Sequence, residues 1–378
     1  MKKRFSLVVF VLLIVMMVTA CGSQPAAPAP APAPAAKPAE KPADGKIGGT
    51  LNILVMPGYE EAKIIKPFED KYGVKVNAKI YPSSDEMFAI LSASKPGEWD
   101  VTTPDTPWIE KMQKAGMIKP LDPKDYPAIQ NFYDQFKKFS QCYVGEQMYG
   151  IVSRWGYYGI VYNSKFVSKA DVESIKVMWN AKYKKKIVLF DWYLPNMGMI
   201  GRYLGFNQPY DVNAADLKKI EASLQTLKPQ IGAIAATNSD TIQALANGSM
   251  WLSFGGEWLQ VLLKEQGHPI ELSLPKEGGV SWTECLAIMK DSKNPEAAKA
   301  FVQYMISPEV QAKIAWADAF HATVPNTGAG KLLTKDQAAM LHMDDANLMA
   351  DMLKRIATRK VPVDEKAWQS IWEKFKSK

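Results

Sequence analysis

Residues 50–81 read TLNILVMPGYEEAKIIKPFEDKYGVKVNAKIY, and this stretch carries the clearest signal of fold class in the chain. An apolar run at residues 51–55 is typical of a buried strand, and it ends at a Pro-Gly pair. Over residues 62–72 apolar side chains recur at helical spacing, and Gly73 then ends the helix. In residues 74–80 apolar and polar side chains alternate, which is the period-2 pattern of a strand. The stretch therefore predicts a β-α-β unit.

The same pattern recurs downstream of the first unit. A helix is expected at residues 84–93, a strand at 99–103, and a further helix that begins at Thr106-Pro107 with a hydroxyl cap and a proline in its first turn. Alternating units of this kind predict an open, mostly parallel sheet with helices on both faces. Because ligands of such sheets bind at the carboxyl ends of the strands, the loops at residues 56–59 and 104–108 are candidate ligand loops.

The rest of the chain adds a second set of strands and helices. Residues 148–163 form a long β-rich segment with glycines, which could run from one domain into the next. Strands are expected at residues 187–190 and 250–254. A helix is expected at residues 214–228, and another begins at Asn294-Pro295. About 330 residues follow the N-terminal region, which is more than one domain usually holds, so two domains are expected.

The N-terminus has the features of a lipoprotein signal peptide. A basic start at residues 1–4 precedes an apolar run at residues 7–18, which is too short to span a bilayer comfortably. Small residues then stand immediately before Cys21, which is the order of a bacterial lipobox. Residues 1–20 are therefore expected to be removed and Cys21 to be diacylated, so that acyl chains hold the protein at a membrane. The alternative is an ordinary secretory signal with a chance cysteine.

An Ala/Pro-rich segment at residues 21–48 separates the expected lipid anchor from the folded part. Ala-Pro alternation removes backbone donors and favours polyproline II, so this segment is interpreted as a spacer. The signal, the cysteine and the spacer together predict an extracytoplasmic protein that is lipid-anchored to the outer face of the cytoplasmic membrane, in a periplasm or at a cell surface.

The distribution of charge argues against a nucleic-acid partner, and the cysteine content allows one disulfide. The formal net charge is +7, but acidic and basic residues are interspersed without a basic block, so no nucleic-acid partner is expected. Apart from Cys21 the chain has two cysteines, Cys142 and Cys285. An exported protein could pair them, and two buried thiols are the alternative.

Three segments give this chain a resemblance to the periplasmic spermidine/putrescine-binding proteins, within the type II solute-binding superfamily. It extends over roughly residues 49–335 and is carried by residues 99–118, by residues 238–256 and, most specifically, by PKEGGVSWTE at 275–284 with the segments that follow it. The resemblance implies an α/β, two-domain type II periplasmic-binding-protein fold, in which each domain is a mostly parallel sheet flanked by helices and the ligand cleft lies between them. The expected domains are residues 49–153 plus 285–328 and residues 154–284 plus 329–378.

The resemblance also implies a set of ligand-binding residues. In the family a tryptophan covers the alkyl chain of the ligand and an acid two residues later holds an ammonium group, and Trp282 and Glu284 match these two positions. Other family positions are matched by Tyr59, Asp105, Asp191 and Phe254, and Trp155 in the expected crossover strand completes the candidates. Carboxylates at the ends and aromatic faces along the methylenes are what a polyamine requires.

Several residues depart from the family pattern or allow a second interpretation. Met56, Pro57, Pro107 and Leu194 stand where the family has other ligand-contacting residues. Arg154 would suit a carboxylate or phosphonate ligand, or it could simply pair with Glu284. Asp105 could instead cap a helix, and Asp191 could be a turn former.

These observations predict a substrate-binding lipoprotein of an ABC importer that captures spermidine, putrescine or a related small cation by hinge closure near Ser153–Trp155 and Glu284–Leu286. The expected partners are the solute, the permease, its ATPase and the membrane, for a protein that is otherwise a monomer. The histidines lie singly and the sequence contains no nucleophile or phosphate-loop motif, so no enzymatic activity, catalytic residue, cofactor or metal site is expected. The alternatives are the same class with a zwitterionic or anionic solute (amino acid, phosphonate or ferric ion), and an exported sensor or enzyme.

Overall fold

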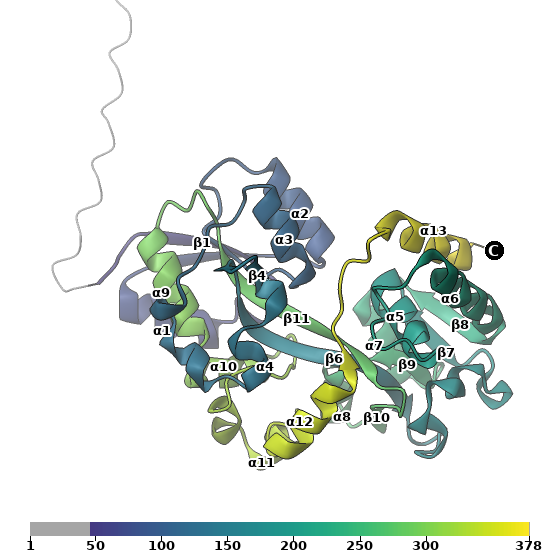
Figure 1. Cartoon of the computed structure of the whole chain (residues 1–378). Helices are drawn as coiled ribbons and strands as arrows, with labels where there is room; N and C mark the ends of the chain where they lie inside the picture. Colours follow the sequence, from purple (N-terminus) through teal and green to yellow (C-terminus); the bar gives the residue numbers. More distant parts are fainter. Residues whose placement is uncertain (1–45, 378) are drawn as a thin grey trace, which may run out of the picture. The chain divides into compact units, whose positions relative to one another are not determined.

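The computed structural model describes residues 46–377, so the predicted signal peptide, the lipidation at Cys21 and most of the spacer lie outside the described residues. Ten strands form one sheet in the order β2-β1-β3-β11-β6-β9-β7-β8, with β10 beside β6 and β12 beside β11 (Figure 1). The strands of this sheet are β1 (Thr50–Val55), β2 (Lys75–Ile80), β3 (Val101–Thr102), β6 (Ile151–Asn163), β7 (Ile187–Phe190), β8 (Ile231–Ala235), β9 (Leu252–Gly255), β10 (Ile270–Ser273), β11 (Gly279–Ile288) and β12 (Ile356–Ala357). A separate pair consists of β4 (Tyr143–Val144) and β5 (Gln147–Met148).

The first β-α-β unit is confirmed. Strands β1 and β2 pair in parallel, and helix α1 (Ala62–Tyr72) between them buries Ile64, Ile65 and Phe68. Gly73 ends the helix at φ +66°, a left-handed conformation that glycine adopts without steric cost, and its N–H donates to the carbonyl of Glu69. The spacing of apolar residues in this stretch thus specifies both the elements and the buried face of the helix.

Strands β6 and β11 are shared by both halves of the sheet. All thirteen residues of β6 are buried, and the strand pairs antiparallel with β11 from Tyr158 opposite Val280 to Ile151 opposite Leu286. Beyond this pairing β11 reaches β3 on one side, while β6 reaches β9 and β10 on the other. The register shifts between Glu284 and Cys285, so the pairing is irregular in the middle of the two strands.

We call the elements around β1 the first lobe and those around β7 the second lobe. In the first lobe β1 is parallel to β2 and β3, and in the second lobe β7 is parallel to β8 and β9, as the predicted fold class requires. The first-lobe helices are α1, α2 (Ser84–Ala93), α3 (Pro107–Lys114), α4 (Asp134–Lys137), α9 (Pro295–Met305) and α10 (Pro308–Ala315). The second-lobe helices are α5 (Tyr193–Tyr203), α6 (Ala214–Leu227), α7 (Asn238–Ala246), α8 (Glu257–Glu265) and α13 (Glu365–Lys376).

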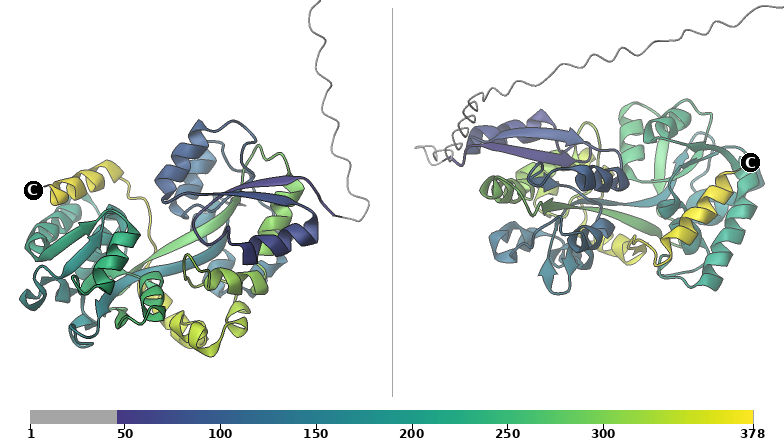
Figure 2. Two further views of the ribbon diagram at one scale, coloured as in Figure 1. Left: turned by 180° about the vertical axis from the view of Figure 1, so that it is seen from behind. Right: turned by 90° about the horizontal axis from the view of Figure 1, so that it is seen from above.

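The C-terminal part of the chain contacts both β11 and the second lobe. After α11 (Lys335–Met340) and α12 (Ala346–Lys354), strand β12 pairs in parallel with the start of β11. The chain then runs to α13, which packs on α5 and α6 and buries Trp368, Trp372 and Phe375. Both views in Figure 2 show this yellow helix beside the teal elements of the second lobe.

Two helix starts test the predicted capping. At α9 the side chain of Asn294 accepts a hydrogen bond from the N–H of Ala297, as expected. At α3 the predicted hydroxyl cap is wrong, because Thr106 makes no side-chain cap and its hydroxyl donates to Oε1 of Gln141 at 2.7 Å. The preceding strand is also shorter than predicted, since it extends only over Val101–Thr102. Within residues 46–377, no helix combines the length and the apolar composition needed to cross a membrane.

Cys142 and Cys285 form a disulfide, which settles the choice between pairing and two buried thiols. The bond joins the first-lobe segment before β4 to the middle of β11 and closes a loop with a sequence separation of 143.

Reduction of this disulfide is expected to lower the Tm by several degrees, because a cross-link of a long loop typically contributes about 2–4 kcal/mol. Differential scanning calorimetry with and without a phosphine reductant measures the effect. The double variant Cys142→Ala/Cys285→Ala is the control and should melt at one temperature in both conditions. An identical Tm for the oxidised and reduced wild-type protein would contradict the prediction.

Candidate ligand-binding site

The site is built on one face of β6 and β11. Side chains alternate along a strand, so Arg154, Gly156 and Tyr158 of β6 share a face with their partners on β11, which include Trp282 and Glu284. We call this the interlobe face, because these two strands join the lobes. The carboxyl ends of β1, β3, β7 and β9 supply the residues that meet it, as is usual for ligand sites of open α/β sheets.

Glu284 and Arg154 form a buried ion pair at the centre of the interlobe face. Nε of Arg154 lies 2.7 Å from one carboxylate oxygen of Glu284 and Nη2 lies 3.3 Å from the other, and both side chains are almost completely inaccessible. The guanidinium also donates to the carbonyl of Pro57 and lies between the rings of Tyr59 and Phe320, 4.4 and 4.6 Å from their centroids. Burial raises the pKa of Glu284, and the guanidinium opposes that effect. Of the two alternatives for Arg154, the structure has the pairing with Glu284.

A second buried pair lies beside the first. Nη2 of Arg359, in the segment between β12 and α13, lies 2.5 Å from the carboxylate of Asp105, which also accepts a bond from the hydroxyl of Ser84. The guanidinium of Arg359 lies over the ring of Trp192, 4.4 Å from its centroid. Burial raises the pKa of Asp105, although Arg359 opposes this, and the carboxylate does not cap α3. Nε and Nη1 of Arg359 are buried without a hydrogen-bond partner among the described residues.

Four aromatic rings pack together on the interlobe face, and we call them the aromatic cluster. Its members are Tyr158, Trp258, Trp282 and Phe320, with ring centroids 4.9–5.8 Å apart in the contacting pairs. Trp258 and Trp282 are nearly buried, and Phe320 belongs to a first-lobe segment, so the cluster connects the two lobes.

Glu257 is the first residue of α8 and follows Gly255-Gly256 at the carboxyl end of β9. Its side chain is 1% exposed and lies against the Cα of Gly156, on the same side as the Trp282 indole. A side chain at Gly156 would meet both groups at 2.7 Å, so this position requires glycine. Burial raises the pKa of Glu257 to about 8.

The other predicted site residues lie apart from the two ion pairs. Asp191 accepts hydrogen bonds from Nε1 of Trp372 at 2.7 Å and from Nζ of Lys376 at 2.9 Å, both on α13. Trp155 lies on the opposite face of β6, where its ring packs on a first-lobe phenylalanine. Phe254 is a core residue of β9 opposite Ile160. The structure thus brings together Tyr59, Asp105, Trp282 and Glu284 of the predicted set.

Sequence reasoning missed Glu257, Arg359, Trp258 and Phe320. For Glu257 a signal existed, because an acid directly after Gly255-Gly256 stands at the end of a predicted strand, where ligands bind. For Arg359 no local signal existed, since its partner Asp105 is 254 residues away in the sequence.

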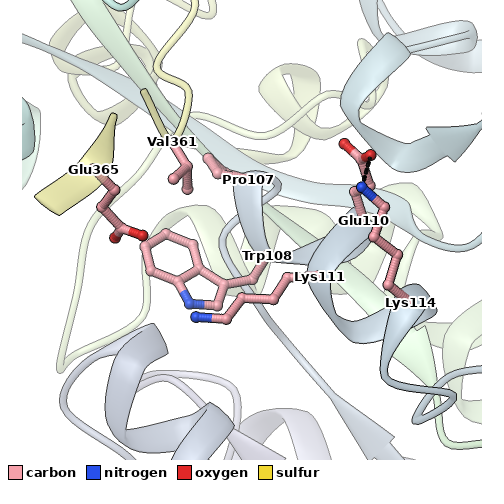
Figure 3. Close-up of a pocket in the computed structure, with 7 residues that line it drawn as sticks. All are labelled: Pro107, Trp108, Glu110, Lys111, Lys114, Val361 and Glu365. Atoms are coloured by element: carbon pink, nitrogen blue, oxygen red, sulfur yellow. Dashed lines mark ion pairs between the residues drawn. The ribbon is translucent and has the colours of Figure 1, made fainter. Parts of the chain in front are cut away.

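A pocket of about 280 Å³ lies next to Asp105, between helix α3 and the C-terminal segment. Figure 3 shows Trp108 and Lys111 of α3 pointing toward Glu365 of α13, with Pro107 and Val361 nearby. The hydroxyl of Tyr193 donates to Glu365 at 2.7 Å, so the pocket wall is tied to the second lobe.

The interlobe face can hold a small solute by charge and by aromatic contact. Its carboxylates and arginines suit ammonium or carboxylate groups, and its rings suit methylene chains. Among the described residues, no group of three or more histidine, cysteine, aspartate or glutamate side chains could hold a metal ion.

Comparisons with known proteins agree on one family. The model of the bacterial extracellular solute-binding proteins matches residues 63–341. The spermidine/putrescine-binding periplasmic protein of Escherichia coli K12 is 29% identical over 321 residues, which cover 85% of this chain and 88% of that protein. The protein of the same name from Salmonella typhimurium LT2 is 29% identical over 281 residues, or 74% of this chain and 78% of the relative.

A solved structure of similar fold is the spermidine/putrescine ABC transporter substrate-binding protein PotD from Streptococcus pneumoniae, in complex with calcium and HEPES. Its TM-score is 0.74 at 22% identity, and the match covers 87% of this chain and 99% of that one. This likeness confirms the predicted type II periplasmic-binding-protein fold.

Replacing Arg154 by methionine is expected to lower the free energy of unfolding by about 3–5 kcal/mol, because Glu284 would stay buried without its counter-ion. The double change Arg154→Met/Glu284→Leu removes both charges and should recover part of that loss. Urea unfolding followed by tryptophan fluorescence measures both variants. A single variant within about 1 kcal/mol of wild type would show that the pair is not closed in solution.

Proposed function

The chain belongs to the bacterial extracellular solute-binding proteins, and from this premise we propose that it is the ligand receptor of an ABC importer and captures a polyamine or a related small cationic solute. Its family is a class of transport proteins rather than of enzymes, and we assign it no catalytic step. The relatives compared above are named for spermidine and putrescine, which supports a ligand with primary ammonium groups on a short methylene chain.

The proposal rests on one observation, which is that buried carboxylates and aromatic rings lie close together on the interlobe face. Glu284, Asp105 and Glu257 are all buried there beside the aromatic cluster. Carboxylates bind ammonium groups through charge-assisted hydrogen bonds, and aromatic faces attract cations and cover methylenes. Tyr59, Trp282 and Glu284 stay our predicted ligand contacts from the family pattern, although a ligand at Glu284 must share its carboxylate with Arg154.

Capture is proposed to occur by hinge closure of the two lobes. We place the division between Ser153 and Arg154 on β6 and between Glu284 and Cys285 on β11, which gives domains of residues 49–153 plus 285–328 and 154–284 plus 329–378. The register shift between Glu284 and Cys285 supports a hinge there, because an irregular ladder bends more readily than a regular one. Closure around the solute would create the form that docks on the permease.

The cellular setting follows from the N-terminal sequence. We propose that residues 1–20 are a signal peptide, that Cys21 carries acyl chains, and that residues 21–48 are a spacer. The protein would then work as a lipid-anchored monomer outside the cytoplasmic membrane, together with a permease and an ATPase.

A second ligand class is favoured by one observation. Nε and Nη1 of Arg359 are buried donors without a partner among the described residues, and a carboxylate would satisfy one of them. A solute with an ammonium group at one end and a carboxylate at the other would use Arg359 as well as an acid of the interlobe face.

A thermal-shift screen tests the ligand class. Putrescine and spermidine are expected to raise the Tm, since a ligand at 100 times its Kd stabilises the native state by about 2.7 kcal/mol. The matched control is 1,4-butanediol, which has the carbon chain of putrescine without its charges and should leave the Tm unchanged. A shift with γ-aminobutyrate but with neither polyamine would reject the polyamine assignment and favour the zwitterionic class.

Lipidation is tested by metabolic labelling with a palmitate analogue. The Cys21→Ala variant is expected to lose the label, because the acyl chains are proposed to be attached at that cysteine. The Cys142→Ala variant keeps Cys21 and should be labelled like wild type. Label that persists in Cys21→Ala would contradict the proposed anchor.

A further inference from the structure

Each of the three acidic residues that the family pattern predicts as ligand contacts is already paired with an arginine or lysine of this chain. Glu284 forms an ion pair with Arg154, Asp105 forms one with Arg359, and Asp191 forms one with Lys376. Two of these pairs are almost completely buried, so a solute would have to displace a guanidinium from a closed site. A carboxylate without a counter-ion would therefore bind an ammonium group more strongly than these paired acids do.

Glu257 is a buried carboxylate on this face that has no ion pair within the described part of the chain. The hydrogen bond that its carboxylate accepts from another residue comes from the N–H of Tyr157, at 3.4 Å. A buried acid without a counter-ion is costly, and such groups occur where a ligand or a chemical function requires them.

One aromatic ring, the Trp282 indole, lies next to the Glu257 carboxylate and connects it to the aromatic cluster. Its carboxylate and the Trp282 indole lie against the same Cα, that of Gly156. Trp258, the next residue along α8, packs edge-to-face on Trp282 at 5.8 Å and is stacked with Phe320 at 5.8 Å. A carboxylate beside a tryptophan ring is a favourable environment for an alkylammonium group, because the charge and the ring both attract the cation.

We propose that Glu257 is the carboxylate that binds a primary ammonium group of the solute, with the aromatic cluster covering the adjoining methylenes. This inference rests on the proposed function and assigns its main specificity determinant to a residue outside the family pattern. Glu284 then has a positioning role, since it holds the Arg154 guanidinium between Tyr59 and Phe320 and so fixes one side of the cluster.

The proposal predicts that the protein releases a proton when the solute binds. Burial raises the pKa of Glu257 to about 8, which favours the protonated carboxyl at pH 7, and we expect an arriving ammonium group to expel that proton. His321 faces the C-terminal end of α8, where its Nε2 lies 3.2 Å from Glu265, and burial lowers its pKa. Tyr157, Tyr158 and Tyr162 are phenols whose pKa burial raises further, and the charged groups Arg154, Asp240, Glu271 and Glu284 are bonded to other residues.

The variant Glu257→Gln is a fair test because it preserves size and resembles the protonated acid. A folded-state pKa above the unfolded value of 4.5 means that Glu257 favours folding least at high pH, since its contribution is lost as pH rises through 8. The variant should therefore melt at or above the wild-type temperature at pH 7, and further above it at pH 9. This measurement shows that the variant is folded before its affinity is compared.

Isothermal titration calorimetry of the full-length protein with putrescine tests the proposal. Titrations at pH 7 in two buffers of different ionisation enthalpy give both the Kd and the protons released. Wild type is expected to release close to one proton, and Glu257→Gln to bind at least 30-fold more weakly without proton release. Glu271→Gln, a change of the partly exposed acid that pairs with Lys264, is the matched control and should behave like wild type.

The outcomes separate the two proposals. If wild type binds neither putrescine nor spermidine, the proposed function fails and this inference fails with it. If wild type binds but Glu257→Gln binds equally well, only the role of Glu257 is overturned. Should Glu257→Gln not fold, Glu257→Asp takes its place, because it moves the carboxylate away from Trp282; binding equal to wild type would overturn the role of Glu257.

Discussion

The antiparallel pairing of β6 with β11 is the constraint on which the rest of the structure depends. These strands alone among the described elements extend through both lobes, and their shared face carries Arg154, Trp282 and Glu284. Because the register fixes which side chains lie opposite one another, a slip by one residue would move all of them to the other face. Fold and site are therefore specified by the same ladder of hydrogen bonds.

Each of two buried carboxylates on this face is neutralised by an arginine of the protein. Glu284 with Arg154 and Asp105 with Arg359 form two neighbouring pairs whose charges cancel, and each group influences the others electrostatically. Removal of such charges from water is unfavourable unless they are paired and hydrogen-bonded, so the pairs are best understood as fixed parts of the wall. Glu257 and two donors of Arg359 have no such counter-ion among the described residues, and with the aromatic cluster they are the groups we propose for a solute.

Much of the fold could be predicted because it is encoded locally. The period of apolar residues in 50–81 specifies a strand, a helix and a strand, and Gly73 marks the boundary between two of them. The site was predictable only where a residue follows a strand or matches the family pattern, as Tyr59 and Glu284 do. Arg359 could not be found in this way, since long-range packing alone brings it to Asp105. The capping role predicted for Thr106 failed because its backbone is already helical, at φ −55° and ψ −34°, and its hydroxyl is directed at Gln141, which is distant in the sequence.

The two ends of the described chain are fastened to different lobes. Gly48 is bonded to α1 and to Asn294 of the first lobe, whereas α13 is packed on α5 and α6 of the second. Under the proposed hinge closure, a fluorophore at each end would convert solute capture into a change of distance, which is the layout of a genetically encoded sensor. Under the same proposal, a protein immobilised at Gly48 would keep its first lobe fixed, and the second lobe would be the part that moves.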